Sequence, residues 1–282
     1  MVIVTFWNDN TGKIGQTHSA MAIASYMGTE HNYKTLLMTT RYDDQIALKA
    51  FGYEGTAKTV GLVTGNKQSM DLESGLEGME KLVLAKRLSP DMVPNYTKII
   101  YKNRLEVVTA PKKRDDLDFN RLYNSCKDIL MIARQHYDIV FVDLNNGLEN
   151  ETTKEILKMS NIIILNMEQK PSEMQKIYEL KQNKELFDAK KIMYLINNYD
   201  RKSKYSSKNI SREMGEKKEI MTVPYANLFA EAVQEGTAAE FFLNTRIKRL
   251  DDVEDRTAFF IRELKRDTDA IVYKMQELQM RI

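Results

Sequence analysis

The chain has 282 residues, of which 43% are hydrophobic and 29% charged, a composition that is ordinary for a globular protein and excludes a disordered one. Its 42 basic and 40 acidic side chains give a net charge of +2, so attraction to nucleic acid or to an anionic membrane would have to come from a local patch. The lone cysteine, Cys126, excludes an intrachain disulfide, and no run of about 20 apolar residues could cross a bilayer, so we expect a cytoplasmic protein without a signal peptide or a transmembrane segment.

Short apolar runs of strand length recur along the first two-thirds of the chain. They are rich in β-branched and aromatic residues, and several are apolar at consecutive positions, as expected of strands that helices cover on both faces. These runs lie at 2–7, 35–39, 105–109, 139–142, 162–166 and 192–196. Segments with helical spacing lie between them, at 19–27, 122–136, 152–159 and 172–183. The alternation predicts an α/β fold with a doubly wound, mostly parallel sheet flanked by helices.

Two parts of the chain depart from this alternation. Residues 52–102 are richer in glycine and polar residues and end in the stretch 96–101, which fits either an added element or a variable insertion. From Asp251 onward the sequence has a long, charged helical pattern without proline or glycine. We therefore expect a domain at 1–250 and a C-terminal helical extension at 251–282, packed on that domain or on a partner.

A polar loop follows the first strand and leads directly into a helix. Residues 8–19 read NDNTGKIGQTHS, and a loop at this place directs backbone N–H groups and a helix N-terminus toward an anion. In the phosphate-binding pattern G-x-x-x-x-G-K-[ST], Gly15 and Thr17 match, whereas Asn10 replaces the first glycine and Gln16 replaces the lysine. Taken alone, the loop fits a phosphate site and an ordinary βα turn equally well.

The first strand IVTFW, this loop and the helix THSAMAIASYM resemble the opening of the ParA/MinD group of P-loop ATPases, whose loop reads K-G-G-x-G-K-[ST]. The resemblance implies a P-loop fold, a homodimer, and ATP or ADP bound with Mg²⁺. The nucleotide-binding residues that it implies in the loop are Thr11, Gly12, Lys13, Ile14, Gly15, Gln16, Thr17 and His18. In this register Thr11 occupies the family's signature lysine, which reaches the partner's nucleotide, so both loop lysines are absent. The flexible ammonium of Lys13 offers one replacement.

The segment YDIVFVD at 137–143 resembles the family's YDxhhhD strand and is the most specific match in the chain. The resemblance implies that Asp143 holds Mg²⁺ through water and that the Thr17 hydroxyl is a direct ligand. The alternative is an aspartate that caps the following turn. Residues 144–147, LNNG, differ from the small residues and proline that the family usually shows there.

The second strand lacks the family's acidic residues. Residues 34–43 align with the pattern KVLLIDxDPQ, so that the two aspartates fall on Thr39 and Arg41. Asp43 and Asp44 lie further along, but two residues of strand move a side chain by about 6–7 Å. Since a hydrolytic site needs much closer placement, we expect no efficient hydrolysis and no catalytic residue.

Two later segments resemble the part of the family fold that lines the adenine base. The strand at 192–200 ends in Asn197 and Asn198, whose amides can donate to and accept from a purine edge, although a pair of turn asparagines is an equal alternative. The segment VPYANLF at 223–229 resembles the family's (I/V)P-(Y/F) strand and implies base contacts from Pro224 and Tyr225.

A basic stretch follows the strand at 192–200. Its residues Lys202, Lys204, Lys208 and Arg212 would suit non-specific DNA binding through phosphate contacts, but a solvated helix face is the commoner explanation of such a run.

The leading hypothesis is a ParA/MinD-like spatial organiser or assembly scaffold, closest to the TadZ/CpaE branch that places pilus or secretion machinery. ATP binding would be weak or absent, and a protein partner and the homodimer would carry the function. The alternative is a slow ATPase for plasmid or chromosome partition, with Lys13 replacing the loop lysine and Asp43 or Asp44 the missing acid. A third hypothesis is a binding module that uses residues 96–101 and the terminal helix.

Overall fold

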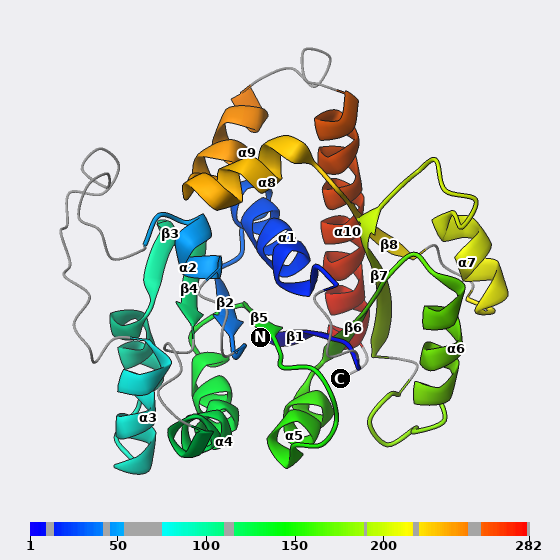
Figure 1. Ribbon diagram of the computed structural model, residues 1–282. Helices are drawn as coiled ribbons and strands as arrows, with labels where there is room; N and C mark the ends of the chain where they lie inside the picture. Colours follow the sequence, from blue (N-terminus) through cyan, green and yellow to red (C-terminus); the bar gives the residue numbers. More distant parts are fainter. Residues whose placement is uncertain are drawn as a thin grey trace.

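One eight-stranded sheet forms the centre of the computed structural model, which describes residues 1–9, 14–41, 46–53, 75–109, 116–188, 191–216, 220–247 and 255–280 (Figure 1). The strand order is β3-β4-β2-β5-β1-β6-β7-β8. The strands are β1 (Val2–Trp7), β2 (Thr35–Thr39), β3 (Lys98–Tyr101), β4 (Leu105–Thr109), β5 (Ile139–Asp143), β6 (Ile162–Met167), β7 (Ile192–Tyr199) and β8 (Met221–Pro224). Neighbouring strands are parallel except for the β3–β4 pair.

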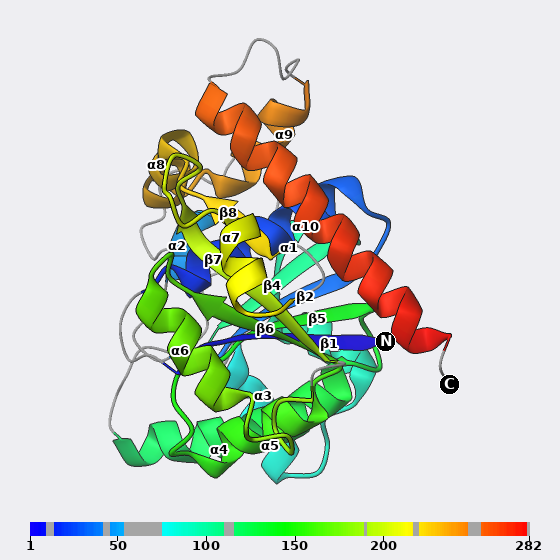
Figure 2. The ribbon, with the colours of Figure 1, turned by 90° about the vertical axis from the view of Figure 1, so that its right-hand side faces the viewer.

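Helices cover both faces of the sheet, as Figures 1 and 2 show from two sides. One face packs against α1 (Gln16–Glu30), α2 (Ile46–Ala50), α8 (Asn227–Glu235), α9 (Ala238–Ile247) and α10 (Asp255–Gln279). The other packs against α3 (Leu76–Leu84), the 3-10 helix η1 (Pro90–Tyr96), α4 (Asp116–Ala133), α5 (Glu151–Met159), α6 (Pro171–Leu180) and α7 (Ser207–Glu213). This arrangement confirms the predicted doubly wound fold.

The predicted strands are present because their runs are apolar on both faces. The strands β1, β2, β4 and β5 are buried at every position. The expectation was less accurate for helix starts: α1 begins at Gln16, three residues before the predicted apolar segment, because its first turn is polar. Residues 98–101, left open by the sequence, form the antiparallel edge strand β3, which is only half-buried.

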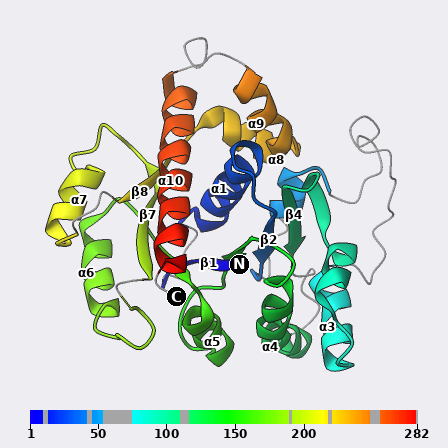
Figure 3. The same cartoon turned by 180° about the vertical axis from the view of Figure 1, so that it is seen from behind.

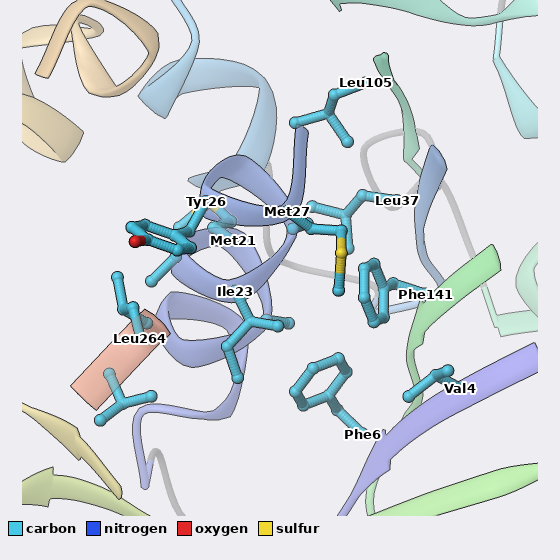
Figure 4. Packing of buried hydrophobic residues seen from close by; sticks show 14 of the residues in the cluster. Val4, Phe6, Met21, Ile23, Tyr26, Met27, Leu37, Leu105, Phe141 and Leu264 are labelled. Atoms are coloured by element: carbon cyan, nitrogen blue, oxygen red, sulfur yellow. The ribbon is translucent and has the colours of Figure 1, made fainter. Parts of the chain in front are cut away.

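Helix α1 is held rigidly between the sheet and α10. Ile23 and Met27 point toward the sheet, where Phe6 and Phe141 meet with ring centroids 5.8 Å apart (Figure 4). On its far side α1 packs against α10, the C-terminal helix that the sequence predicted (Figure 3). Twelve of the residues of α1 are buried. The loop that precedes α1 is therefore attached to a fixed element.

Helix α10 also covers the outer edge of β8. The backbone N–H of Thr222 donates to Asp267 Oδ2 (2.9 Å), and Arg266 Nη2 donates to the carbonyl oxygen of Ile220 (3.4 Å). Burial raises the pKa of the Asp267 carboxyl well above its usual value, while the adjacent Arg266 opposes the rise. Side chains of α10 thus occupy positions that a further strand would take.

Two further expectations concern the whole chain. The division into a domain at 1–250 and an extension at 251–282 stays a prediction. Within the described residues, no helix is both long and apolar enough to cross a membrane.

Candidate functional site

A pocket of about 320 Å³ opens at the carboxyl edge of the sheet, where β2, β7 and β8 end and α1 begins. Its walls differ in character. We call residues 15–19 with Arg41 the polar half, and residues 223–226 with Asn198, Phe229 and Phe260 the apolar half. In open α/β sheets, ligands bind outside the carboxyl ends of the strands, so this pocket is the place where the fold offers a binding site.

Gly15 determines how closely the start of α1 approaches β7. It caps the helix with φ at +86°, and a Cβ atom there would lie 2.9 Å from Asn198 Nδ2. The positive φ favours glycine, and a larger residue would also have to displace the Asn198 side chain. The first N–H groups of α1 have no acceptor within the helix and lie beside the pocket, where the helix dipole favours an anion.

Gln16 lies at the position where the family resemblance places a lysine, and its amide bonds to neighbouring protein atoms. Nε2 donates to Asp143 Oδ1 (2.6 Å), to the carbonyl oxygen of Leu144 (2.9 Å) and to that of Phe6 (3.2 Å). Oε1 accepts from Asn8 Nδ2 (2.6 Å). With only 2% of its surface exposed, Gln16 is part of a buried network at the base of the polar half.

Thr17 and Asp143, the two predicted metal ligands, are brought together. Thr17 Oγ1 donates to Asp143 Oδ2 (2.6 Å), and the Asp143 side chain is fully buried. Thr39 pairs with Asp143 in register across β2 and β5, and its buried hydroxyl has no hydrogen-bond partner in the described part of the chain. A carboxylate with neighbouring hydroxyls is a set of hard oxygen donors, which suits Mg²⁺.

Arg41 also faces the pocket, at a position where the family pattern has an aspartate. Its Nη1 donates to Asn146 Oδ1 (2.7 Å), which accepts a second bond from Asn8 Nδ2 (3.2 Å). Sequence reasoning did not include Arg41, Asn8 or Asn146 among the site residues. Of these three residues, only Arg41 could have been found from the sequence, because it lies just beyond the carboxyl end of the central strand β2. Asp43 and Asp44 lie outside the described residues.

The apolar half contains the residues predicted to contact a base. Pro224 and Tyr225 line it, and Tyr225 is 56% exposed. Asn198, with φ at +52°, lines the pocket too, whereas Asn197 is 3% exposed and accepts from Ser19 Oγ (2.6 Å). Behind them the rings of Phe229 and Phe260 stack with centroids 5.2 Å apart.

The structure thus gathers most of the predicted nucleotide residues around one pocket. Those that line it are Ile14, Gly15, Gln16, Thr17, His18, Asn198, Pro224 and Tyr225. Thr11, Gly12 and Lys13 lie outside the described residues. Asn197 lies behind the wall and orients Ser19.

The predicted basic patch lies on the surface after β7. Lys202, Lys204, Lys208 and Arg212 are exposed, in the turn that follows the strand and on α7. The Lys204 ammonium lies 5.0 Å from the centre of the Tyr205 ring, which keeps part of this charge over an aromatic face.

No family model matches the chain, and no curated protein matches its sequence. Solved structures with a similar fold include a ParA family ATPase from Chlorobium tepidum, which is 16% identical with a TM-score of 0.63, over 92% of this chain and 95% of that one. The septum site-determining protein MinD of Pyrococcus horikoshii, complexed with Mg-ADP, is 14% identical with a TM-score of 0.63, over 96% and 97%. MinD in the MinC:MinD cell division protein complex of Aquifex aeolicus is 14% identical with a TM-score of 0.59, over 94% and 95%. The chain therefore has the fold of the ParA and MinD ATPases.

Proposed function

We propose that this protein is a ParA/MinD-like spatial organiser or assembly scaffold, a cytoplasmic homodimer that acts with a protein partner. Its pocket binds ATP or ADP with Mg²⁺ weakly and does not hydrolyse ATP efficiently. The TadZ/CpaE branch, which places pilus or secretion machinery, is the closest functional type. The fold, the position of the pocket and the Mg-ADP and MinC complexes described for similar structures support this proposal.

Gln16 is the observation that carries the proposal. A lysine there would place a positive charge against the phosphates, whereas the Gln16 amide is neutral and donates to Asp143 and Leu144. A hydrogen bond from a charged donor contributes roughly 1.5–3 kcal/mol. Its loss lowers nucleotide affinity by about tenfold or more.

Hydrolysis is disfavoured for a second reason. Positioning an attacking water in this fold falls to acidic side chains at the end of β2, and this chain has Thr39 and Arg41 there. A hydroxyl and a guanidinium cannot accept a proton from water as a carboxylate can.

Thr17 and Asp143 would hold the Mg²⁺ that accompanies a nucleotide. The ion would supply positive charge against the phosphate oxygens, which this chain's loop supplies poorly. The direct bond between the two side chains shows that they already converge on one point.

Calorimetric titration of ATP and ADP with Mg²⁺, together with a turnover assay, tests the proposal. We expect weak binding to the wild type, loss of binding in Asp143→Ala, and no turnover above background. The matched control is Asp128→Ala, which removes an exposed carboxylate from α4. Mg²⁺-dependent turnover that disappears in Asp143→Ala would instead establish an ATPase.

The exposed basic patch supports one alternative, a slow partition ATPase that binds DNA non-specifically. Phosphate contacts would make duplex binding strongly salt-dependent. If this alternative holds, replacing both Lys204 and Lys208 by glutamine weakens duplex binding and flattens its salt dependence. If the wild type does not bind duplex DNA, or if the variant binds it as tightly as the wild type does, the alternative is wrong and the organiser hypothesis stands.

A further inference from the structure

Arg41 provides a positive charge at the polar half of the pocket. It follows β2 directly, and the same edge of the sheet carries the start of α1. Of the described residues that line the pocket, Arg41 alone is permanently charged. Its guanidinium thus faces the region where the N–H groups of the first turn of α1 also point.

The described contacts of Arg41 leave donor capacity for a ligand. The guanidinium carries five N–H donors, and one of them donates to the neutral amide oxygen of Asn146. The planar fork of an arginine matches two oxygens of a phosphate group, and charge-assisted pairs of this type are stronger than a bond to a neutral amide. A phosphate in the polar half would therefore compete well with Asn146 for this side chain.

Neighbouring groups fit the same ligand. Thr39, two residues before Arg41, has a buried hydroxyl without a described partner next to Asp143, so this part of the site contains unused polar capacity. Gly15 allows the backbone to approach closely, and Thr17 completes the wall. The apolar half, with Tyr225 and Phe260, continues the pocket in a way that suits the rest of a nucleotide.

We infer that Arg41 is the anion-binding residue of this pocket and that it contacts phosphate oxygens of a nucleoside diphosphate or triphosphate directly, in place of the charge that Gln16 lacks. The identification of the anion as a nucleotide rests on the proposed function. The pocket then obtains its charge from the end of β2, and the phosphate-binding loop provides backbone N–H groups and Thr17.

Binding of a phosphate to Arg41 would change the hydrogen bonds of Asn146. Its Oδ1 accepts from both Arg41 and Asn8, and Asn8 also donates to Gln16. When a phosphate takes Arg41, Asn146 keeps the bond from Asn8 and loses the other. The Asn146 amide therefore links the segment that follows Asp143 to the occupied state of the pocket.

Calorimetry with inorganic pyrophosphate and with ADP, both without Mg²⁺, tests the role of Arg41. We expect both probes to bind the wild type, and both to bind Arg41→Gln about tenfold or more weakly. Arg41→Lys keeps the charge and loses the fork, so its affinity should lie between the two. The control Arg134→Gln removes an arginine near the start of β5, at the opposite edge of the sheet, and should bind as the wild type does.

The outcomes separate this inference from the proposed function. If ADP and pyrophosphate bind Arg41→Gln as tightly as the wild type, while circular dichroism shows both folded, the role of Arg41 is overturned and the nucleotide pocket stands. If pyrophosphate binding depends on Arg41 but ADP does not bind even when Mg²⁺ is added, the anion site stands and the nucleotide function fails. If the wild type binds neither probe without Mg²⁺, the role of Arg41 is overturned, and the titration with Mg²⁺ decides the nucleotide function. Should Arg41→Gln fail to fold, Arg41→Lys replaces it in the test, and its affinity for both probes should be lower than that of the wild type.

Discussion

The polar and apolar halves of the pocket are built from different kinds of contact. In the polar half, the Gln16 amide accepts from Asn8 Nδ2 and donates to Asp143 Oδ1, each at 2.6 Å. In the apolar half, Phe229 and Phe260 belong to the hydrophobic cluster that joins α1, α8, α9 and α10 to the sheet. The structure of the polar half depends on which donors and acceptors meet, and that of the apolar half depends on the volume of its side chains.

This difference explains how one half can change its chemistry while the fold stays the same. A neutral amide at position 16 can satisfy the groups around it, because only the matching of donors and acceptors is required. The aromatic residues of the other half cannot change in this way without leaving a cavity in the core. We therefore expect stability to fall on loss of side-chain volume in the apolar half and on loss of hydrogen bonds in the polar half.

The largest effect is expected for Phe260→Ala. Phe260 is 1% exposed and packs against the rings of Phe229, Phe241 and Phe242. Its truncation should lower the free energy of unfolding by about 3–5 kcal/mol, measured by urea denaturation. Tyr273→Ala, on an exposed position of the same helix, should change it by about 0.5 kcal/mol or less. Equal losses in both variants would contradict the assignment of this half to the core.

Gln16→Leu tests whether the polar half depends on hydrogen bonds. The leucine has a similar volume but removes the bonds that the Gln16 amide makes to Asn8 Nδ2, Asp143 Oδ1 and the Leu144 carbonyl, so the free energy of unfolding should fall by about 1–3 kcal/mol. Gln175→Leu, on the exposed face of α6, is the control. A variant as stable as the wild type would show that the network contributes no stability.

Gln16→Lys should restore nucleotide affinity. The ammonium would add a charge beside the first turn of α1, and we expect ADP with Mg²⁺ to bind about tenfold more tightly, equivalent to about 1.4 kcal/mol. Turnover should remain absent because Thr39 and Arg41 are unchanged. Calorimetry with Gln175→Lys as the control makes the comparison, and an unchanged affinity would show that Gln16 does not limit binding.

The smallest effect is expected for Tyr225→Ala, because this ring is more than half exposed. Stability should change by about 0.5 kcal/mol or less. Affinity for ADP should fall by about 1 kcal/mol through lost stacking, while affinity for pyrophosphate, which has no base, stays the same. Tyr178→Ala, another exposed tyrosine, is the control. Parallel losses for both ligands would place Tyr225 at the phosphates instead.

Much of the fold could be predicted because the buried strands are apolar at consecutive positions. The edge strand β3 was left undecided because Lys98 and its neighbours are only partly covered. In the site, the spacing of Gly15, Thr17 and Asp143 was sufficient to place them at one edge. The bonds of Arg41 to Asn146 and of Gln16 to Asn8 could not be predicted, because they depend on side-chain directions across separate loops.

The pair Asn197 and Asn198 shows the same limit at the scale of one residue. Both lie near the end of β7, and from the sequence both were expected to contact a base. The structure directs Asn197 inward to Ser19, whereas Asn198, which has a left-handed backbone, lines the pocket. Alternation along a strand predicts two faces, but a local change in φ decides which one meets a ligand.

The bonds from α10 to β8 also limit how copies of this protein can associate. A strand from a second copy could pair with β8 only after displacing Asp267 and Arg266 from Thr222 and Ile220. At the other edge, the carbonyl oxygen of Ile99 accepts from Tyr53 Oη (2.7 Å). Both ends of the sheet thus resist the edge-to-edge pairing that leads to fibres. Contact between copies through the helical surfaces would leave these edge bonds in place.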